Sequence, residues 1–472
     1  MFEYESTNKL AVKKIFTNEE EGTLVDYLKK AATMHYGLSK NETKILAYQF
    51  AKANGKQVPD NWDKNKKAGI EWMRGFMKRH PTLSHRKSEA TSLARATSFN
   101  KDNVRKFFDN LESCISRGNF SPDRIFNLDE TANTTVHVPP KIVAIKGLKQ
   151  VGSVTSGERG VNVTMIAAIN AIGNQVPPML IFPRKNFKDH MLRGAPPGCI
   201  GAANSSGWST EEIFVQYLKH FIAHVSPSKD NPTILILDNH ETHVSIPAIN
   251  IARATGVILL TLPPHTSHKT QPLDRTVFGP YKTFYNQAAS EWMTCNPGKP
   301  ITIYDIAAII GKSYPRAFTP HNIVKGFEVT GIWPLNRNIF REDDYLSAFV
   351  TDRPGPESTE ELAPVSPKNV STDEAIPSTS TTIGVCVTPE QIRPFPKAAP
   401  RKTTGRRGRQ KGKSRILTDT PEKTQVEQQK SKKLIPLKLT SRVQKKIVDP
   451  TDRWTRKNKS KKQDALGWNK LN

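Results

Sequence analysis

The chain has 472 residues, which is long for one ordinary domain and enough for two or three. Hydrophobic residues make up 36% of it, so a sizeable core is expected, with part of the chain outside that core. Lys and Arg number 70 against 44 Asp and Glu, a formal charge of +26, which favours a polyanionic partner such as nucleic acid.

The cysteines and the apolar segments exclude two further classes of protein. The 4 cysteines stand singly without metal-ligand spacing, which argues against a disulfide framework and fits a reducing, intracellular location. No stretch approaches the roughly 20 apolar residues of a membrane span. The N-terminal stretch MFEYESTNKL lacks the apolar core of a signal peptide. No membrane partner is expected.

The first 60 residues are predicted to form helices. Thr17 with Glu20 and Ser39 with Glu42 have the spacing of capping boxes, in which each side chain bonds the backbone of the other residue at the start of a helix. An apolar stripe with helical spacing follows the second box. We therefore assign residues 1–60 to a helical segment.

A helix-turn-helix is predicted next, within residues 61–120. One helix covers about residues 66–79 and is stopped by Pro81, and a second is expected over residues 84–96 after a short turn. Residues 64–95 contain nine Lys and Arg against two Glu, which favours a DNA-binding surface. The alternative is a plain helical bundle with one basic face.

Residues 121–345 have a different pattern, in which short apolar runs alternate with helical segments. The runs include RIFNLDE, VNVTMIAAINA, VPPMLIF, PTILILD and GVILLTL, and residues 209–225 and 244–256 have helical periodicity. Strands that are covered by helices on both faces are apolar throughout their length. The region is therefore predicted to be a mixed α/β core.

The remaining chain is predicted to be a linker followed by a tail. Residues 346–400 are rich in Pro, Ser, Thr and acid, so they are expected to be a disordered acidic linker. Residues 401–472 contain 23 Lys and Arg against 6 Asp and Glu, densest at residues 401–415 and 456–462. This basic tail is a solvated disordered tail, a nuclear-import or nucleic-acid patch, or both, and it leads us to expect a protein of the nucleus.

Three aspartates end or begin elements of the core. Asp129 follows the run RIFNL, Asp238 follows PTILIL, and Asp274 precedes an amphipathic segment. The carboxyl edge of a sheet is where α/β proteins place their ligands. If the strands that carry Asp129 and Asp238 are neighbours, the three side chains meet at that edge. Taken alone, Asp238 would be explained more simply as a helix cap.

Three carboxylates at one place would raise one another's pKa unless a cation neutralised them. Mg²⁺ prefers oxygen ligands and takes one or two carboxylates beside water and phosphate oxygens. Two such ions about 4 Å apart can hold the attacking and leaving oxygens of a phosphodiester. Asp129, Asp238 and Asp274 are therefore predicted to be catalytic residues and ligands of Mg²⁺ or Mn²⁺.

Other polar residues near the acids have simpler interpretations. Glu130 alternates to the other side of the strand from Asp129 and is expected to be structural. Asn239 follows Asp238 and is expected to help orient it. The nearby histidines have no standard zinc spacing and are interpreted as ordinary polar loop residues, namely His240, His243, His265 and His268.

The order of motifs through the core resembles that of pogo/Tigger-type DDE transposases of the mariner superfamily, to which jerky and centromere protein B are related. The stretches that carry the resemblance are NLDET, GERGVNVT, PPMLIFPR, GAPPG, LDNH, LPPHTSHKTQPLD, VFGPYK and GFEVTGIWP. Residues 69–100 also resemble the second helix-turn-helix of the centromere-protein-B-type DNA-binding domain. Several motifs in the order of the family make the match specific, whereas any one alone would be weak.

The resemblance implies an RNase H-like core whose three catalytic aspartates match Asp129, Asp238 and Asp274. It implies metal-dependent hydrolysis of double-stranded DNA at element ends, such as terminal inverted repeats, followed by attack of the freed 3′-hydroxyl on target DNA. Family members usually carry a pipsqueak-type helix-turn-helix upstream, which we expect to be absent here or reduced to a stub. Its absence favours a rival function, a domesticated or truncated DNA-binding protein without catalysis.

The sequence therefore predicts an α/β RNase H-like catalytic core with an N-terminal all-α helix-turn-helix DNA-binding region and a disordered C-terminal tail. The expected function is sequence-specific DNA binding with DDE-type cleavage and strand transfer. At the start of the helix expected over residues 84–96, Arg86 and Lys87 should lie at base edges, and Arg95 should lie at a backbone phosphate. The expected partners are double-stranded DNA and a second copy of the chain in a homodimer.

Overall fold

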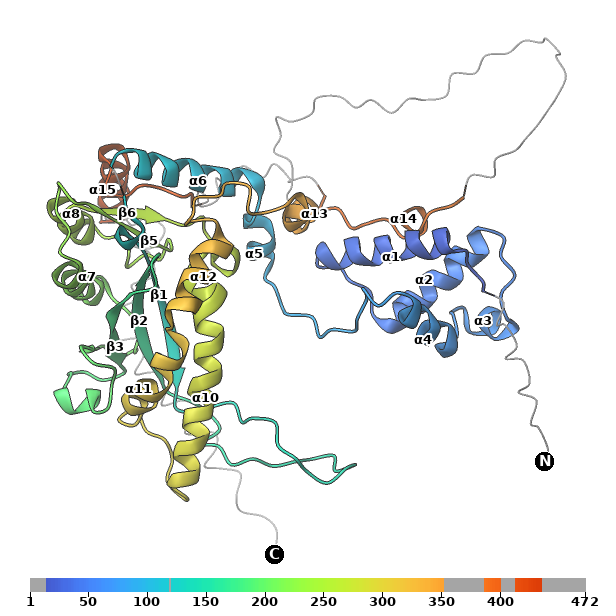
Figure 1. Cartoon of the computed structure of the whole chain (residues 1–472), viewed down its shortest axis with the longest axis horizontal. Coiled ribbons are helices and arrows are strands. Elements are labelled where there is room, and N and C mark those ends of the chain that lie inside the picture. The colour runs from blue at the N-terminus through green and yellow to red at the C-terminus, as the bar shows by residue number, and fades with distance from the viewer. Residues whose placement is uncertain (1–13, 119, 352–385, 400–411, 435–472) are drawn as a thin grey trace, which may run out of the picture. The chain divides into compact units, whose positions relative to one another are not determined.

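The computed structural model describes residues 14–118, 120–351, 386–399 and 412–434. The chain divides into two compact units, Met1–Asp419 and Thr420–Asn472. The first unit contains an N-terminal helical bundle and an α/β core, each with its own cluster of buried apolar side chains (Figure 1). The described part of the second unit is one helix, α15 (Thr420–Leu434).

The first two helices of the bundle begin at capping boxes, as predicted. The hydroxyl of Thr17 accepts from Glu20 N at 3.2 Å, the carboxylate of Glu20 accepts from Thr17 N at 2.8 Å, and Ser39 and Glu42 repeat the arrangement. Buried apolar residues from every helix fill the centre, including Leu24, Leu46, Phe50, Trp62 and Phe76. The helices are α1 (Asn18–Thr33), α2 (Lys40–Ala53), α3 (Asp60–Asn65) and α4 (Ile70–Arg79).

The prediction of a helix over residues 84–96 is wrong. After α4, residues 80–92 are not helical, and the next helix, α5, covers only Leu93–Ser98. Beyond Leu83 this stretch has no large apolar side chain, so a helix there would lack the buried face that stabilises short helices in proteins. The helices joined by a short turn are instead α3 and α4, with Lys66 between them in the left-handed region at φ 52°.

Six strands of the described core form a mixed sheet in the order β4-β3-β2-β1-β5-β6. β1, β2 and β3 are successively antiparallel, whereas β5 and β6 continue parallel to β1 on its other side. This is the RNase H-like arrangement, so the predicted fold class of the core is confirmed. The strands are β1 (Ile125–Thr134), β2 (Asn162–Asn170), β3 (Gln175–Phe182), β4 (Ile200–Ala203), β5 (Thr233–Leu237) and β6 (Val257–Thr261).

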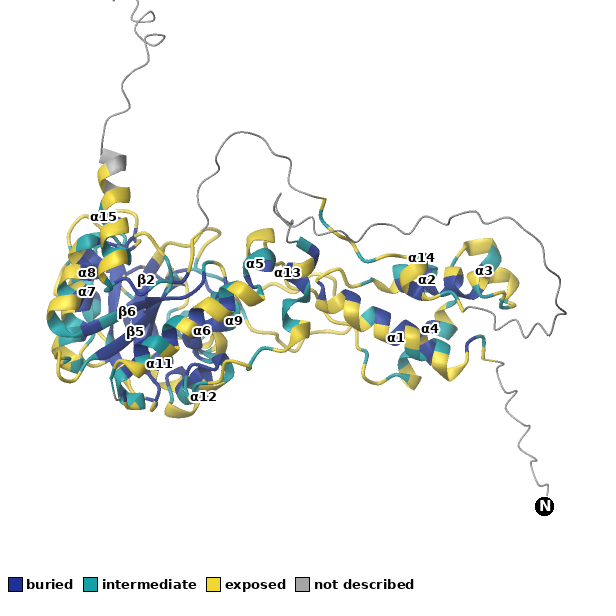
Figure 2. Cartoon of the chain, turned by 90° about the horizontal axis from the view of Figure 1, so that it is seen from above, coloured by how far each residue is buried: buried dark blue, intermediate teal, exposed yellow. Residues whose placement is uncertain are grey.

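Helices cover both faces of this sheet, with α7 and α8 on one side and α10 and α12 on the other (Figure 1). All five residues of β5 are buried, which explains why that strand is apolar throughout (Figure 2). The helices and turns of the core are α6 (Lys101–Ser116), η1 (Pro122–Arg124), η2 (Asp189–Leu192), α7 (Glu211–Val225), α8 (Ile246–Thr255), α9 (Ser267–Thr270), the π-helical turn η3 (Leu273–Val277), α10 (Phe278–Cys295), α11 (Ile306–Ala317), α12 (Pro320–Thr330), η4 (Glu342–Tyr345) and α13 (Leu346–Thr351).

The alternation of side chains along β1 decides which of its polar residues face the α10 side of the sheet. Ile125 packs in the same buried cluster as residues of α10, α11 and α12. Because side chains two residues apart lie on the same face of a strand, Asn127, Asp129 and Asn133 share that face with Ile125. Glu130 lies on the opposite face.

Residues 386–399, within the predicted disordered linker, pack on the N-terminal bundle. Phe395 stacks on Tyr27 with ring centroids 4.8 Å apart, and the Tyr27 hydroxyl donates to Arg393 O at 2.8 Å. Arg393 also forms an ion pair with Glu42 at 3.0 Å. The prediction of a structureless linker is therefore wrong for this segment, which contains α14 (Pro389–Ile392), because its apolar residues bury surface. It is also wrong for residues 346–351, which form a helix with buried residues.

Residues 412–419, within the predicted basic tail, lie along the outer edge of β6. Thr261 N donates to Arg415 O at 2.9 Å, and Leu417 N donates to Leu259 O at 2.9 Å. The segment pairs with backbone groups that a sheet edge would otherwise leave free for another chain. This stretch therefore belongs to the core. The predicted disorder of the tail is also wrong for residues 420–434, which form α15, while residues 401–411 and 435–472 lie outside the described residues.

Candidate active site

Three different elements bring the predicted acids to one edge of the sheet. Asp129 lies within β1, Asp238 follows the last residue of β5, and Asp274 is the second residue of η3. β1 and β5 are parallel, with Asn127 opposite Ile236. Asp129 and Asp238 each lie two residues further along their strands, so they come side by side. The condition stated for the three acids to meet, that the strands carrying Asp129 and Asp238 are neighbours, is therefore fulfilled.

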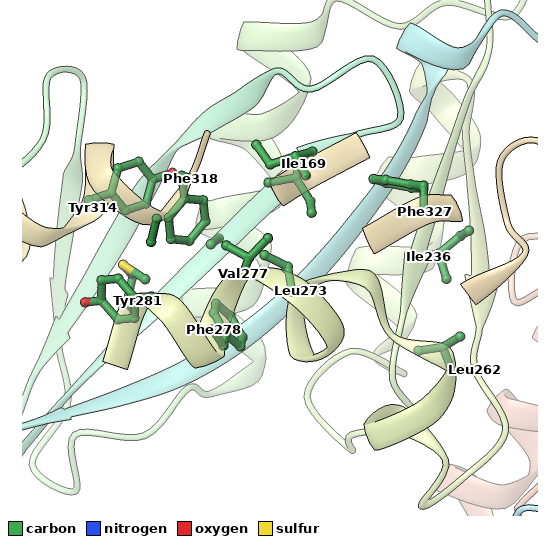
Figure 3. Close-up of a cluster of buried hydrophobic side chains, with 14 of the residues drawn as sticks. Ile169, Ile236, Leu262, Leu273, Val277, Phe278, Tyr281, Tyr314, Phe318 and Phe327 are labelled. Carbon is green, nitrogen blue, oxygen red and sulfur yellow. The ribbon is translucent and has the colours of Figure 1, made fainter. Parts of the chain in front are cut away.

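Asp274 reaches this edge because the turn that carries it is attached to the sheet. Leu273 and Val277, on either side of it in η3, are fully buried among residues of the core helices and strands (Figure 3). The backbone N–H of Leu273 donates to Asn127 Oδ1 at 3.1 Å. π-Helical turns are rare and occur often at functional sites. Here the turn buries its apolar residues and leaves Asp274 at the edge.

The three acids act on one another electrostatically. Burial raises the pKa of Asp129 well above its usual value, and the charges of Asp274 and Asp238 raise it further. Burial also raises the pKa of Asp274, with a contribution from Asp238, although a hydrogen bond from Ser267 opposes the rise. The carboxylates therefore lie close enough to repel one another, and a bound cation would relieve that repulsion.

Asp238 differs from the other two acids because a buried histidine holds it. His243 Nδ1 lies 2.7 Å from Asp238 Oδ1, and His243 Nε2 lies 3.3 Å from Glu130 Oε1. Burial alone would raise the pKa of Asp238, but the hydrogen bond and the charge of His243 outweigh burial and lower it. Burial would lower the pKa of His243, but its bonds to Asp238 and Glu130 raise it to about 9. The imidazole therefore links the two acids as a protonated ring that donates from both nitrogens.

The interpretation of His243 as an ordinary polar loop residue is wrong. Its side chain is only 2% exposed, and its ring lies against Phe214 of α7 with centroids 4.5 Å apart. Glu130, which was expected to be structural, completes the hydrogen bonding of this ring. The feature of the sequence that could have indicated this pairing is the short spacing from Asp238 to His243, which lets the chain turn back onto the end of β5.

Asn239 fastens the end of β5 rather than the carboxylate beside it. Its amide nitrogen donates to Leu262 O, directly after β6. The expectation that Asn239 helps to orient Asp238 stays a prediction. The bond to Leu262 holds the turn that follows Asp238, so any effect on the acid passes through the backbone.

The oxygen donors at this edge suit a hard divalent cation, although the three carboxylates do not all converge on one metal position. Across the described ranges, no group of three or more His, Cys, Asp or Glu side chains is arranged to hold a metal ion. Asp129 and Asp238 offer the one or two carboxylates that Mg²⁺ commonly takes, which leaves positions for water and phosphate oxygens. Burial and the charges of Asp274 and Asp238 raise the pKa of Asp129, and a bound Mg²⁺ or Mn²⁺ would offset both effects.

The predicted DNA-contact residues lie in two different settings. Arg86 and Lys87 are exposed on the non-helical residues 80–92, so they do not begin a helix as predicted. Arg95 is exposed on α5, where its charge opposes the rise in the pKa of Asp274. Arg95 therefore lies within electrostatic reach of the acids, a proximity that its position in the sequence does not indicate.

The sheet order and the three aspartates define a class of protein: an RNase H-like core with acids on β1, after β5 and before α10. Residues 160–327 match the family model described as DDE superfamily endonuclease. The match includes Asp238 and Asp274 and begins after Asp129. Residues 160–327 are therefore similar to the DDE superfamily endonucleases, in agreement with the resemblance found in the motifs.

Two curated proteins are similar to parts of the chain. The "MFS-type transporter clz9" of Cochliobolus lunatus is 31% identical over 179 residues, which are 38% of this chain and 19% of that protein. The "Pogo transposable element with ZNF domain" of Homo sapiens is 24% identical over 226 residues, 48% of this chain and 15% of that protein. The chain therefore spans less than a fifth of the length of either relative. Within the part of the chain that is described, no helix is long and apolar enough to cross a membrane.

Solved structures of the Mos1 transposase are distant neighbours. The Mos1 strand transfer complex shares 9% identity with a TM-score of 0.42, covering 69% of this chain and 78% of that chain. The Mos1 mariner paired end complex with Mn shares 12% identity with a TM-score of 0.39, covering 70% of this chain and 82% of that chain. The fold assignment rests on the sheet order rather than on these likenesses.

Proposed function

We propose that this chain is a DNA-binding protein of transposase descent whose core cleaves DNA and joins strands with the help of a divalent metal ion. The observation that carries the proposal is the placement of Asp129, Asp238 and Asp274 at one edge of the sheet by β1, β5 and η3. The match of residues 160–327 to the DDE superfamily endonucleases supports it.

Each residue of the site has a distinct role in this proposal. Asp129 and Asp238 hold Mg²⁺ or Mn²⁺, and Asp274 adds a third carboxylate from η3. The bound ion supplies charge neutralisation and lowers the pKa of the attacking water or 3′-hydroxyl. His243 keeps Asp238 ionised and oriented through its 2.7 Å hydrogen bond. Arg95 adds a positive charge near Asp274 for a backbone phosphate.

Cleavage by the full-length protein tests the proposal. We expect a supercoiled plasmid that carries the genomic DNA from both flanks of the coding region to be nicked with Mg²⁺ or Mn²⁺ by the wild type, and not by Asp238→Asn. Asp230→Asn is the matched control, because Asp230 is exposed and precedes the same strand. Equal nicking by Asp238→Asn and the wild type, or nicking in excess chelator, contradicts the proposal.

The same experiment distinguishes the alternative, a domesticated or truncated DNA-binding protein without catalysis. Such a protein retards the plasmid or its repeat fragments in a gel but leaves them intact with both metal ions. The wild type and Asp238→Asn then behave alike in both assays.

We further propose that α3 and α4 serve as the DNA-binding helix-turn-helix. α4 follows the short turn and carries Arg74 and Lys78 on its exposed side. Combined substitution of Arg74 and Lys78 by Ala should weaken binding of the full chain to a selected duplex. The control is substitution of Lys29, an exposed residue of α1, together with Lys44, a partly exposed residue of α2. Equal losses in both double variants contradict this assignment.

The nucleus is the proposed location, because of the dense basic run in residues 401–415. Since residues 412–419 pack on β6, the test uses substitution rather than truncation. Replacing Arg406, Arg407 and Arg409 by Gln in a fluorescent fusion of the full chain should reduce nuclear enrichment. Unchanged enrichment contradicts a role of this run in nuclear import.

A further inference from the structure

One buried asparagine touches all three elements that carry the acids. Asn127 lies in β1, two residues before Asp129, and is fully buried. Its Nδ2 donates to Ile236 O at 3.1 Å, on β5. Its Oδ1 accepts from Leu273 N at 3.1 Å, at the start of η3.

Each partner of Asn127 lies one or two residues before an acid. Ile236 lies two residues before Asp238, and Leu273 lies directly before Asp274. A second amide supports the junction, because Gln271 Nε2 donates to Leu128 O at 3.3 Å. Close to the acids, hydrogen bonds from side-chain amides to backbone groups therefore fix the distances between β1, β5 and η3.

The chemistry of an amide suits this position. The junction needs a donor for a strand carbonyl and an acceptor for a backbone N–H at the start of a helical turn, which has no partner within that turn. A buried polar side chain is costly unless both of its ends are paired. An apolar residue of the same size would remove both hydrogen bonds and would weaken the attachment of η3 and β5 to β1.

We propose that Asn127 is the positioning residue that sets the spacing of Asp129, Asp238 and Asp274, and hence the affinity and selectivity of the site for divalent metal ions. Asn127 does not touch the metal or the DNA. It acts through the backbones of β5 and η3. This inference rests on the proposed function.

Another asparagine on the same strand provides a matched control. Asn133 is 1% exposed and faces the same side of the sheet as Asn127. Its Nδ2 donates to Val163 O at 3.2 Å, and its Oδ1 accepts from the Tyr281 hydroxyl. Asn133 thus fastens β1 to β2 and α10, away from the residues next to Asp238 and Asp274. Replacement of either asparagine by Leu removes one buried amide from β1.

The test measures Mn²⁺ binding to the full-length chain by electron paramagnetic resonance of free Mn²⁺, without DNA. We expect Asn127→Leu to weaken Mn²⁺ binding about 10- to 100-fold, as loss of residues that orient metal ligands does elsewhere. Asn133→Leu should stay within about twofold of the wild type, and Asp238→Asn gives the level of binding without the site. Near-ultraviolet circular dichroism at the same temperature establishes that each variant is folded.

A second readout separates positioning from general destabilisation. Mg²⁺ demands a more nearly ideal octahedral geometry than larger ions. Plasmid nicking by Asn127→Leu should therefore fall more with Mg²⁺ than with Mn²⁺, whereas Asn133→Leu should keep the wild-type ratio. If Asn127→Leu does not fold, Asn127→Thr replaces it, since a single hydroxyl oxygen then stands in for the two polar atoms that the amide places at different positions.

The outcomes are distinct. Folded Asn127 variants that bind Mn²⁺ as tightly as Asn133→Leu overturn the positioning role while leaving the proposed function intact. A wild-type chain that binds Mn²⁺ no better than Asp238→Asn overturns the metal site and this inference with it. Weakened binding that is confined to the Asn127 variants supports the inference.

Discussion

The edge of the core that carries the acids and the stretch of residues 80–92 are both polar, yet only the first has a geometry fixed by buried partners. Asp238 is held by His243, and the element of Asp274 is held by Asn127. Residues 80–92 are almost entirely exposed and not helical. The comparison teaches that charge alone does not position a functional side chain, because position requires neighbours that are themselves buried and paired.

His243→Leu should cause the largest loss of stability. It leaves Asp238 and Glu130 without their shared partner. Breaking a fully buried ion pair costs roughly 3–5 kcal/mol, and the loss here should lie near the lower end because the Asp238 side chain is 41% exposed. The folded-state pKa of His243, about 9, lies above its usual value of 6.5, so its contribution is complete below pH 6.5 and is lost as the pH rises through about 9. Urea unfolding over this range should show the wild type approaching the variant.

The control for this comparison is His240→Leu, since His240 is exposed two residues after Asp238. It should leave both the stability and its pH dependence close to those of the wild type. If His243→Leu keeps the wild-type decline in stability between neutral and alkaline pH, the paired imidazole is not its source.

Arg79→Ala should destabilise the bundle by about 2 kcal/mol, the worth of a hydrogen bond to a charged group. Glu21, which is 2% exposed, accepts from Arg79 Nε at 2.9 Å and contacts His80 Nε2 at 2.9 Å. Burial would raise the pKa of Glu21, but these partners lower it, so their contribution is present above about pH 4.5 and is lost as the pH falls further. Thermal unfolding at pH 7 and near pH 3 measures this dependence.

Arg74→Ala is the matched control on α4, because Arg74 pairs with Glu71 on the exposed surface. Its loss should change the stability by less than about 0.5 kcal/mol. Mn²⁺ binding should be the same in both variants. A loss of metal binding in Arg79→Ala would show that the stability of the bundle is coupled to the acidic edge of the core.

Asp129→Asn should raise the stability of the metal-free protein at neutral pH, by an amount of the order of 1 kcal/mol. The folded-state pKa of Asp129 lies well above its usual value of 3.8, so ionisation weakens the fold as the pH rises through that pKa. The gain should disappear near pH 4, where the wild-type carboxyl is protonated. If Asp129→Asn is less stable than the wild type at neutral pH, this account is contradicted. It is also contradicted if Mn²⁺ raises the Tm of the variant as much as it raises the Tm of the wild type.

Arg86→Ala should have the smallest effect. The stability should change by less than about 0.5 kcal/mol, because Arg86 is exposed and outside any helix. Binding to DNA should weaken equally for selected and scrambled duplexes, with the salt slope reduced by about one, as for a phosphate contact. A loss restricted to the selected duplex would show that this stretch reads bases. Glu89→Ala is the control in the same stretch.

The sheet could be predicted from the sequence more fully than the site. Apolar runs such as residues 233–237 require burial on both faces, and capping boxes require helix starts at Thr17 and Ser39. The helix expected over residues 84–96 rested on the outline of a helix-turn-helix after the stop at Pro81, without an apolar stripe to pack, and residues 84–92 are not helical. The docked residues 386–399 were obscured by a composition typical of linkers.

The sequence by itself determined the helices and strands whose apolar residues recur with a regular spacing. It also determined the identity of three acids at or beside the ends of such elements. Only the tertiary structure decided what surrounds those acids. Glu130 and His243 are 113 residues apart, and Asn127 and Leu273 are 146 apart. No local pattern links such residues, because their pairing depends on which strands become neighbours and on how η3 packs against the sheet. Periodicity reports what one element buries, whereas the positions of functional side chains depend on hydrogen bonds between elements.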